Sequence, residues 1–560
     1  MAGGNPWISL LLVGREPCCT GRVLRAVRSR PATVAIAVVL IAAFGWGVAL
    51  PRSLFSGDEG IKLAQIQGLD ATSYRDGALL YRGQDSDPEH ALHPLKSAGF
   101  TYEVDGRVYG TYTLIYPALA VPIYRALGFA WVWLLSWLGL AIMLIATARI
   151  AVRVTGSERV AAWSVLALGF ASSTGLYACT IFEHTLAGGC LLSAIAILVG
   201  PVTPRRSLAV GATYALAVAM RTELLVFGPS LLLLCAWRFA KAWRAYARVA
   251  IGGASVLAMF IAFNLVLSKA WHPTLLASKE GPASTFEDRA CHLVAATLHG
   301  WGYVAVWATL AAALFAMLLR RRARVVTALG AIVGALWIWM TWRAIATMGA
   351  RPVVGVFTTA PIVALALVWR RPASSKLLAA AALFVAVLVV LPKRGAIGGL
   401  ELGPRYLIPI LPLVVIAAID AARASRVRIA CAVVLGLAGT AALVANAWSQ
   451  FSIRRLGANI VDVAETANAD VVTSDVWWVA QLATPVQAER IVLVTSYMPA
   501  VWQRLYDSDH RRILVLRGSD PDPGPNLVLR SLDCPCLADR RLEPTLFELD
   551  ERPSRIVQRP

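Results

Sequence analysis

The sequence has little charge for its length, because only 15% of its 560 residues are Asp, Glu, Lys or Arg. Soluble globular chains carry about 25% charged residues. Hydrophobic residues make up 58% of the chain, and its mean hydropathy is +0.63. A protein folded in water cannot bury so much apolar surface. The scarcity of charge therefore excludes an ordinary soluble protein and predicts a chain that lies in lipid.

Motifs for nucleotide cofactors and metals are also missing. The chain has no G-x-x-x-x-G-K-[ST] and no strand-linked G-x-G-x-x-G, so neither ATP hydrolysis nor a dinucleotide is indicated. Its nine cysteines are scattered and show no zinc spacing. We expect no cofactor, and no metal is indicated. Cys291, Cys534 and Cys536 fall on the predicted outer side, where a disulfide persists, but the pattern leaves their pairing open.

Apolar runs of transmembrane length recur from residue 32 to residue 448. A helix of roughly 20 apolar residues crosses a hydrocarbon core of about 30 Å. The fold class is therefore an α-helical polytopic membrane protein with about thirteen transmembrane helices. They are expected at 32–50, 129–148, 160–178, 185–200, 208–220, 224–237, 249–267, 301–319, 325–342, 352–369, 377–392, 406–422 and 429–448.

The formal charge of +20 orients these helices. Basic residues cluster at every second connection, which is the positive-inside pattern and argues against a nucleic-acid partner. The same pattern places 111–128 as a helix at the membrane interface and divides 208–237 into two short helices that turn at Arg221–Glu223. The N-terminus is then cytoplasmic and the C-terminus extracytoplasmic, in a multi-pass protein of the cell (inner) membrane.

Three regions follow from this topology. Residues 1–31 are a cytoplasmic segment, 32–448 form the transmembrane region with outer loops 51–128 and 268–300, and 449–560 form a small extracytoplasmic α/β domain. In the first outer loop, Asp105-Gly106 between strand-forming residues predicts a two-residue hairpin. In the last region, strands are expected at 470–473, 491–495 and 513–516, with helices at 452–467, 476–483 and 498–507.

The most informative polar residues, Asp58 and Glu59, follow the first apolar run directly. They have two interpretations. They are either solvated loop acids or a general base at the mouth of a membrane cavity, where partial desolvation raises a carboxylate's proton affinity. Ionisable residues at membrane level favour the functional interpretation. By contrast, Asp85 to His90 lack the spacing of a calcium loop and are interpreted as a solvated turn.

Three further polar motifs lie at predicted outer ends of helices. Glu183 and His184 suit either an interface hydrogen-bond pair or a proton carrier. Arg221 and Glu223 suit a structural ion pair or substrate ligands. Arg405, followed by Tyr406, starts a helix on the outside against the positive-inside preference, so it either snorkels or binds a phosphate.

Together these motifs resemble the GT-C-fold membrane glycosyltransferases, in the branch of the dolichyl-phosphate-mannose protein mannosyltransferases and bacterial aminoarabinose transferases. The resemblance covers about residues 30–450. Thr222 departs from the proline that relatives often have there, and the C-terminal region matches neither group, so the acceptor stays open. The motifs that carry the resemblance are Gly57-Asp58-Glu59, Tyr109-Gly110 to Tyr116-Pro117, Phe182-Glu183-His184, Arg221-Thr222-Glu223 and Arg405-Tyr406-Leu407-Ile408-Pro409.

The resemblance implies an inverting transfer of a hexosyl or pentosyl group from a polyprenyl-phosphate carrier to an outer lipid, glycan or protein acceptor. It implies that Asp58 is the base and that Glu59 positions the sugar or acceptor. Arg405, with Arg221 or Lys62, stabilises the leaving phosphate. Substrate contacts are expected from Lys62, Tyr109, Glu183, His184, Arg221, Glu223, Arg405 and Tyr406.

Two other functions suit an apolar chain with sparse charges. One is a transporter or flippase of a lipid-linked saccharide, although we find no internal repeat of the kind that transporters usually show. The other is a non-catalytic protein of cell-envelope assembly, which would be indifferent to substitution of Asp58.

Overall fold

The computed structural model describes residues 30–96, 101–201, 203–239, 242–271, 355–369, 371–390, 405–495, 499–517, 528–531 and 543–548, with six single positions between 325 and 339. The expected helix at 301–319, most of that at 325–342, and Cys291, Cys534 and Cys536 lie outside the described residues.

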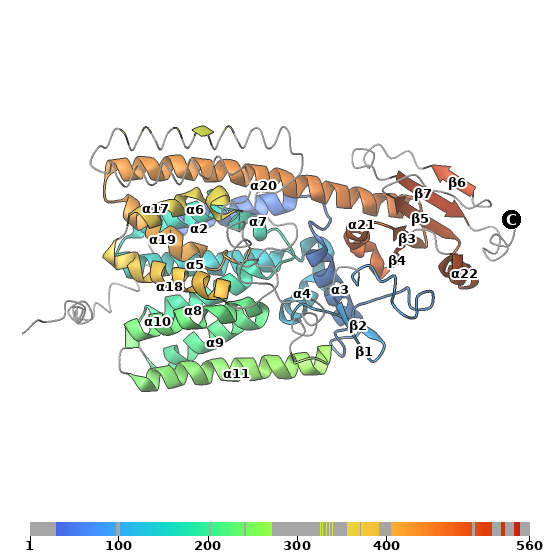
Figure 1. Cartoon of the computed structure of the whole chain (residues 1–560), viewed down its shortest axis with the longest axis horizontal. Coiled ribbons are helices and arrows are strands. Elements are labelled where there is room, and N and C mark those ends of the chain that lie inside the picture. Colours follow the sequence, from blue (N-terminus) through green and yellow to red (C-terminus); the bar gives the residue numbers. More distant parts are fainter. Residues whose placement is uncertain are drawn as a thin grey trace, which may run out of the picture.

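Helices dominate the described part of the chain and lie nearly parallel in a bundle (Figure 1). Five of them are long and apolar enough to cross a membrane, and a bent pair, 361–368 with 372–388, would make a sixth. The bundle helices are α2 (Arg30–Ala49), α5 (Leu134–Thr155), α6 (Glu158–Phe170), α8 (His184–Leu198), α9 (Pro204–Met220), α10 (Gly228–Phe239), α11 (Trp243–Ser268), α18 (Pro372–Val390), α19 (Leu411–Ala422) and α20 (Arg426–Thr466).

Large apolar side chains remain exposed on the outside of the bundle, such as Ile41 on α2 and Met259 on α11, which are 71% and 73% exposed. In water this surface would be unstable, whereas lipid solvates it. The chain is thus a multi-pass membrane protein.

Short connecting helices complete the bundle: α7 (Thr174–Tyr177), α16 (Val356–Thr359), η5 (Pro361–Val363) and α17 (Ala364–Val368).

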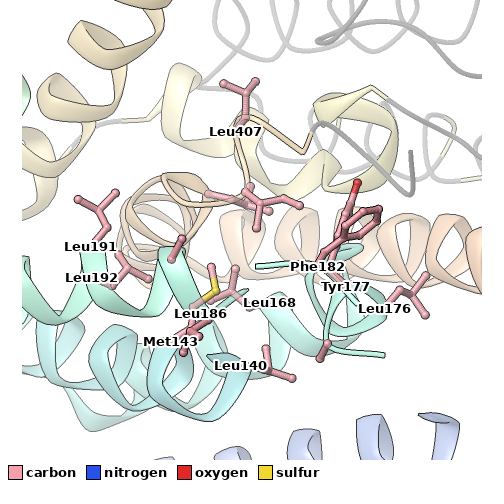
Figure 2. Packing of buried hydrophobic residues seen from close by; sticks show 14 of the residues in the cluster. Leu140, Met143, Leu168, Leu176, Tyr177, Phe182, Leu186, Leu191, Leu192 and Leu407 are labelled. Carbon is pink, nitrogen blue, oxygen red and sulfur yellow. The ribbon is translucent and has the colours of Figure 1, made fainter. Parts of the chain in front are cut away.

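Small residues allow the bundle helices to pack closely, as is common in membranes. A Cβ added at Gly211 of α9 would overlap the carbonyl of Val249 on α11, and one at Gly252 would overlap that of Leu208. Between the helices, apolar side chains such as Met143, Leu168, Leu186 and Phe182 fill the interior (Figure 2).

The helix boundaries confirm one local prediction in the bundle and correct another. The break predicted near Arg221 is present, because α9 ends at Met220, Arg221 is extended, and η3 (Thr222–Phe227) follows. The separate helices expected at 429–448 and 452–467 are instead one 41-residue helix, α20. The polar junction does not interrupt it, because Asn446 and Gln450 are buried and hydrogen-bond to Ser173 and the Leu176 carbonyl.

Helix α3 (Gly57–Ala71), a β-hairpin and α4 (Ile115–Leu127) lie together between the bundle and the C-terminal sheet (Figure 1). The predicted hairpin is confirmed: β1 (Thr101–Val104) pairs antiparallel with β2 (Arg107–Gly110). Its two-residue turn places Asp105 and Gly106 at φ 52° and 67°, the left-handed conformation that such a turn requires. Residues 115–127 are helical, as expected for 111–128.

The C-terminal residues form a five-stranded mixed sheet of order β4-β3-β5-β7-β6. Central β3 (Val471–Ser474) is parallel to β4 (Ile491–Val494) and β5 (Arg512–Arg517), and β7 (Glu543–Glu548) is antiparallel to β5 and β6 (Val528–Ser531). Helices α21 (Trp477–Leu482), η6 (Thr484–Ala488) and α22 (Pro499–Asp507) complete this region.

Helix α21 fixes the start of α3. A Cβ at Gly57 would overlap the Gln481 side chain, and one at Gly60 would lie 2.9 Å from the Gln481 carbonyl oxygen. At Gly60, where the neighbouring atom belongs to the backbone, a residue without a Cβ lets α21 come this close without a shift. The C-terminal region therefore holds the helix that carries Asp58 and Glu59.

Candidate functional site

Asp58 lies in the first turn of α3, whose helix dipole favours a negative charge there. Its carboxylate is ion-paired with Arg405, and both side chains are largely buried, with 12% and 13% exposed. The Tyr112 hydroxyl donates a second hydrogen bond to Asp58. The structure thus brings together two residues that are 347 positions apart in the sequence.

The pKa of Asp58 lies below its ordinary value. Burial alone would raise it, but the positive charges of Arg405 and Lys62 and the hydrogen bond from Tyr112 outweigh that effect. The sequence-based expectation of a carboxylate with raised proton affinity is therefore not met. The reason is the cation beside it.

Lys62 lies one turn further along α3 and is 2% exposed. Its ammonium group is 3.2 Å from the Glu183 carboxylate and 3.7 Å from the centre of the Tyr112 ring. Burial lowers its pKa, although the negative charges of Glu183 and Asp58 oppose this effect. Tyr112, which contacts both Asp58 and Lys62, connects the two charge pairs.

Arg221 completes the cluster from the break between α9 and η3. It pairs with Glu223 and with Glu183, and it donates to His184 Nε2. Arginine has only donors, so Nε2 must be the acceptor and the neutral ring carries its proton on Nδ1. Among the described residues, buried His184 Nδ1 and Arg221 Nε have no hydrogen-bond partner. Such atoms are rare in folded proteins and are available to a ligand.

Tyr406 contacts both arginines of the cluster. Its ring centre is 5.2 Å from the Arg405 guanidinium carbon and 5.4 Å from that of Arg221. An aromatic ring this close to two guanidinium groups stabilises both through cation–π contact.

Glu59 lies beside this cluster but is fully buried. It accepts hydrogen bonds from the backbone N–H groups of Phe55 and Ile181, the latter at 2.7 Å, and from Arg454 at 3.1 Å. Arg454 also donates to the carbonyls of Ser53 and Cys179. Glu59 therefore ties α3 to α20 and to the segment before α8, and so holds α3 in place.

The structure brings eight of the ten predicted site residues together; Glu59 lies beside them, and Tyr109 does not join them. Tyr109 is buried in the hairpin, where it stacks on Tyr102 and hydrogen-bonds to Asp76. Asp58, Lys62, Glu183, His184, Arg221, Glu223, Arg405 and Tyr406 form one connected network of charges.

Sequence reasoning missed Tyr112 and Arg454. Arg454 had a signal, because like Arg405 it is an arginine on the predicted outer side, directly beyond an apolar run. Tyr112 had none, since tyrosines at 102, 109, 112 and 116 look alike in the sequence.

No family model matches the chain, and no curated protein matches it in sequence. Solved structures do match. ArnT from Cupriavidus metallidurans bound to undecaprenyl phosphate aligns over 92% of this chain and 97% of its own, with a TM-score of 0.55 and 11% sequence identity. The chain has the GT-C fold. The predicted resemblance is thereby confirmed at the level of the fold.

Weaker matches to other structures of the GT-C fold accompany this one. ArnT in the apo state has a TM-score of 0.49 at 14% identity, over 92% of this chain and 97% of that one. AglB oligosaccharyltransferase from Archaeoglobus fulgidus, in complex with an inhibitory peptide and a dolichol-phosphate, has a TM-score of 0.41 at 11% identity. That alignment covers 87% of this chain and 70% of AglB.

Within the described residues, no group of three or more His, Cys, Asp or Glu side chains is arranged to hold a metal ion. The acids of the charged cluster are instead paired with cations.

Glu59→Gln tests whether the Glu59 carboxylate holds α3 in place. An amide keeps the size of the side chain but loses the charge that Arg454 and the two N–H groups bind, and each hydrogen bond to a charged group contributes about 1.5–3 kcal/mol. We expect a lower midpoint of thermal unfolding in detergent, followed by tryptophan fluorescence. Glu103→Gln is the control, because Glu103 is half-exposed and its ion pairs contribute about 0–1 kcal/mol. Equal midpoints for the two variants would contradict this role.

Proposed function

We propose that this chain is a membrane glycosyltransferase that moves a sugar from a polyprenyl-phosphate carrier to an acceptor on the extracytoplasmic side. The observation that carries the proposal is the Asp58–Arg405 pair, in which a base and an anion-binding group are held together at the end of an apolar helix bundle (Figure 1). The fold supports it, because the matched ArnT structure holds undecaprenyl phosphate.

In the proposed reaction an acceptor hydroxyl oxygen attacks the anomeric carbon of the lipid-linked sugar. The new glycosidic bond forms as the bond between that carbon and the phosphate oxygen breaks, and the sugar is inverted. The hydroxyl proton passes to Asp58, and the carrier leaves as a polyprenyl phosphate. The developing negative charge on that phosphate is where fixed cations help most.

The Asp58–Arg405 pair gives this reaction an order of events. While the pair is intact, the cation keeps the pKa of Asp58 low, which makes it a weak base. A donor phosphate competes for the Arg405 guanidinium fork, which binds phosphate in a bidentate manner. As Arg405 turns to the phosphate, the buried carboxylate loses its cation and its proton affinity rises. The base is thus activated when the donor is bound.

The surrounding residues have supporting roles in this proposal. Lys62 and Arg221 add positive charge near the phosphate, and the Tyr406 ring stabilises Arg221 and Arg405. Glu183 and Glu223 hold Lys62 and Arg221 in place. His184 offers its Nδ1 proton, and Glu59 positions α3.

The proposed function is tested with purified chain in vesicles that contain a polyprenyl-phosphate sugar and a soluble acceptor hydroxyl. We expect free polyprenyl phosphate to accumulate together with a glycoside of inverted anomeric configuration, which NMR identifies. Intact sugar lipid that only changes leaflet would favour the flippase. If the chain binds the sugar lipid but neither releases polyprenyl phosphate nor moves the lipid between leaflets, the result would favour the non-catalytic assembly protein.

We further propose the topology of thirteen spans, with a cytoplasmic N-terminus and with the charged cluster and C-terminal sheet outside. Cysteines introduced at Asp85 and Arg322 test it, because the basic clusters place these positions on opposite sides. In sealed cells an impermeant maleimide should label position 85 but not position 322. Position 322 should be labelled only after the cells are permeabilised. The reverse pattern would overturn the topology.

A further inference from the structure

Three arginines from three helices converge where α8 ends, at the far end of the bundle from α3. Arg153 of α5 donates to the carbonyl of Ala196. Arg238 of α10 donates to those of Leu198 and Gly200, at 3.3 Å and 2.9 Å, and Arg206 of α9 donates to that of Pro201 at 3.4 Å.

Gly200 makes this convergence possible. A Cβ at Gly200 would lie 2.9 Å from Arg153 Nη1 and 3.1 Å from Arg206 Nη1. The missing side chain therefore lets two guanidinium groups reach the same backbone segment. Arg153 and Arg238 are half-buried, whereas Arg206 is exposed, so the three form a site that is open on one side.

The charge of this arginine cluster is not balanced within the described part of the chain, where none of the three arginines has an ion-paired carboxylate. The end of α8 offers only about half a negative charge through its dipole. A second basic group nearby is built differently. Arg371 and Arg423 share the buried Asp420, and Arg423 also donates to the Thr155 carbonyl at the end of α5. Among the residues that the structure describes, an acid is thus supplied to this second group and not to the arginine cluster.

Two neighbouring side chains suit the surface of a lipid leaflet. Trp237 precedes Arg238 in α10, and the Lys376 ammonium group lies 4.3 Å from the centre of the Trp237 ring. Tryptophan is enriched at membrane–water interfaces, and basic pockets between helices on the cytoplasmic side bind anionic headgroups. The cluster is distinct from the Asp58 site, because α5, with 22 residues of about 1.5 Å rise, separates the two ends of the bundle.

We propose that Arg153, Arg206 and Arg238 bind the phosphate of an anionic phospholipid of the cytoplasmic leaflet. The headgroup oxygens accept the guanidinium N–H groups that the α8 carbonyls leave unused, and the acyl chains lie along the exposed apolar faces of the bundle. The bound phosphate offsets part of the positive charge of the three arginines and holds α5, α9 and α10 together at this end. The site is independent of the proposed transferase function.

Adjacent arginines provide a matched test. Arg205 and Arg206 carry the same charge on the same turn of α9 and are both exposed, but only Arg206 reaches the cluster. Purified full-length chain is exposed to mixed phosphatidylglycerol and phosphatidylcholine, and retained lipid is measured by native mass spectrometry. We expect Arg206→Gln to retain roughly tenfold less phosphatidylglycerol than wild type, because it loses a hydrogen bond between charged groups that contributes at least about 1.5 kcal/mol. Arg205→Gln should match wild type.

Three outcomes would overturn the proposal. Equal losses in the two variants would indicate diffuse attraction between charges, and equal retention of phosphatidylcholine would show that the headgroup charge is not recognised. Displacement of phosphatidylglycerol by an equal concentration of inorganic phosphate would assign the cluster to a free anion. Thermal midpoints measured without added lipid establish that both variants fold.

Discussion

Asp58→Asn is expected to lower the rate of carrier release by about 10²–10⁴, the usual contribution of a positioned general base. The amide keeps the shape of the side chain but cannot accept the acceptor's proton. Donor binding should not weaken, because Arg405 loses the carboxylate that competes with the donor phosphate. The measurement is initial release of polyprenyl phosphate at several donor concentrations, and the loss should appear in kcat and not as an increase in KM.

Asp105→Asn is the matched control for this result. It makes the same change of charge at an exposed turn where asparagine tolerates the left-handed backbone, so release should stay at the wild-type rate. If Asp58→Asn keeps more than about a third of that rate, then Asp58 is not the base. A loss that appears only in KM would assign Asp58 to binding instead.

Arg405→Gln is expected to lower the rate by about 10²–10³, the effect of removing one fixed donor from a developing oxyanion. It should also change the pH dependence. The base works when ionised, so activity is present above the pKa of Asp58 and is lost as the pH falls through it. Arg405 lowers that pKa and burial raises it. Without Arg405, the acid limb of kcat/KM should therefore move to higher pH.

Arg405→Lys separates the two roles of the arginine. Lysine keeps the positive charge but not the planar fork, so the acid limb should stay near its wild-type position while the rate still falls. Were the acid limb of Arg405→Gln to coincide with that of wild type, the ion pair would have no influence on the base. The proposed activation on donor binding would then be wrong, although Arg405 would remain a phosphate ligand if the rate fell.

The sequence alone was sufficient for features that depend on neighbouring residues. Apolar runs located most of the described helices, because a lipid-exposed helix must be apolar along its whole length. Asp105-Gly106 determined the hairpin turn, and the basic clusters on both sides of 208–237 predicted the break near Arg221. The polar motifs at helix ends also gave nearly all members of the charged cluster, since few ionisable residues lie at membrane level.

Only the tertiary structure decided which of these residues meet. The pairing of Asp58 with Arg405, the burial of Glu59 against Arg454, and the place of Tyr112 between Asp58 and Lys62 join segments far apart in the chain. An ion pair depends on where packing brings its partners and on how much solvent it excludes, and neither leaves a local pattern. For the same reason the proton affinity of Asp58 could not be predicted from its neighbours in the sequence, since a distant arginine controls it.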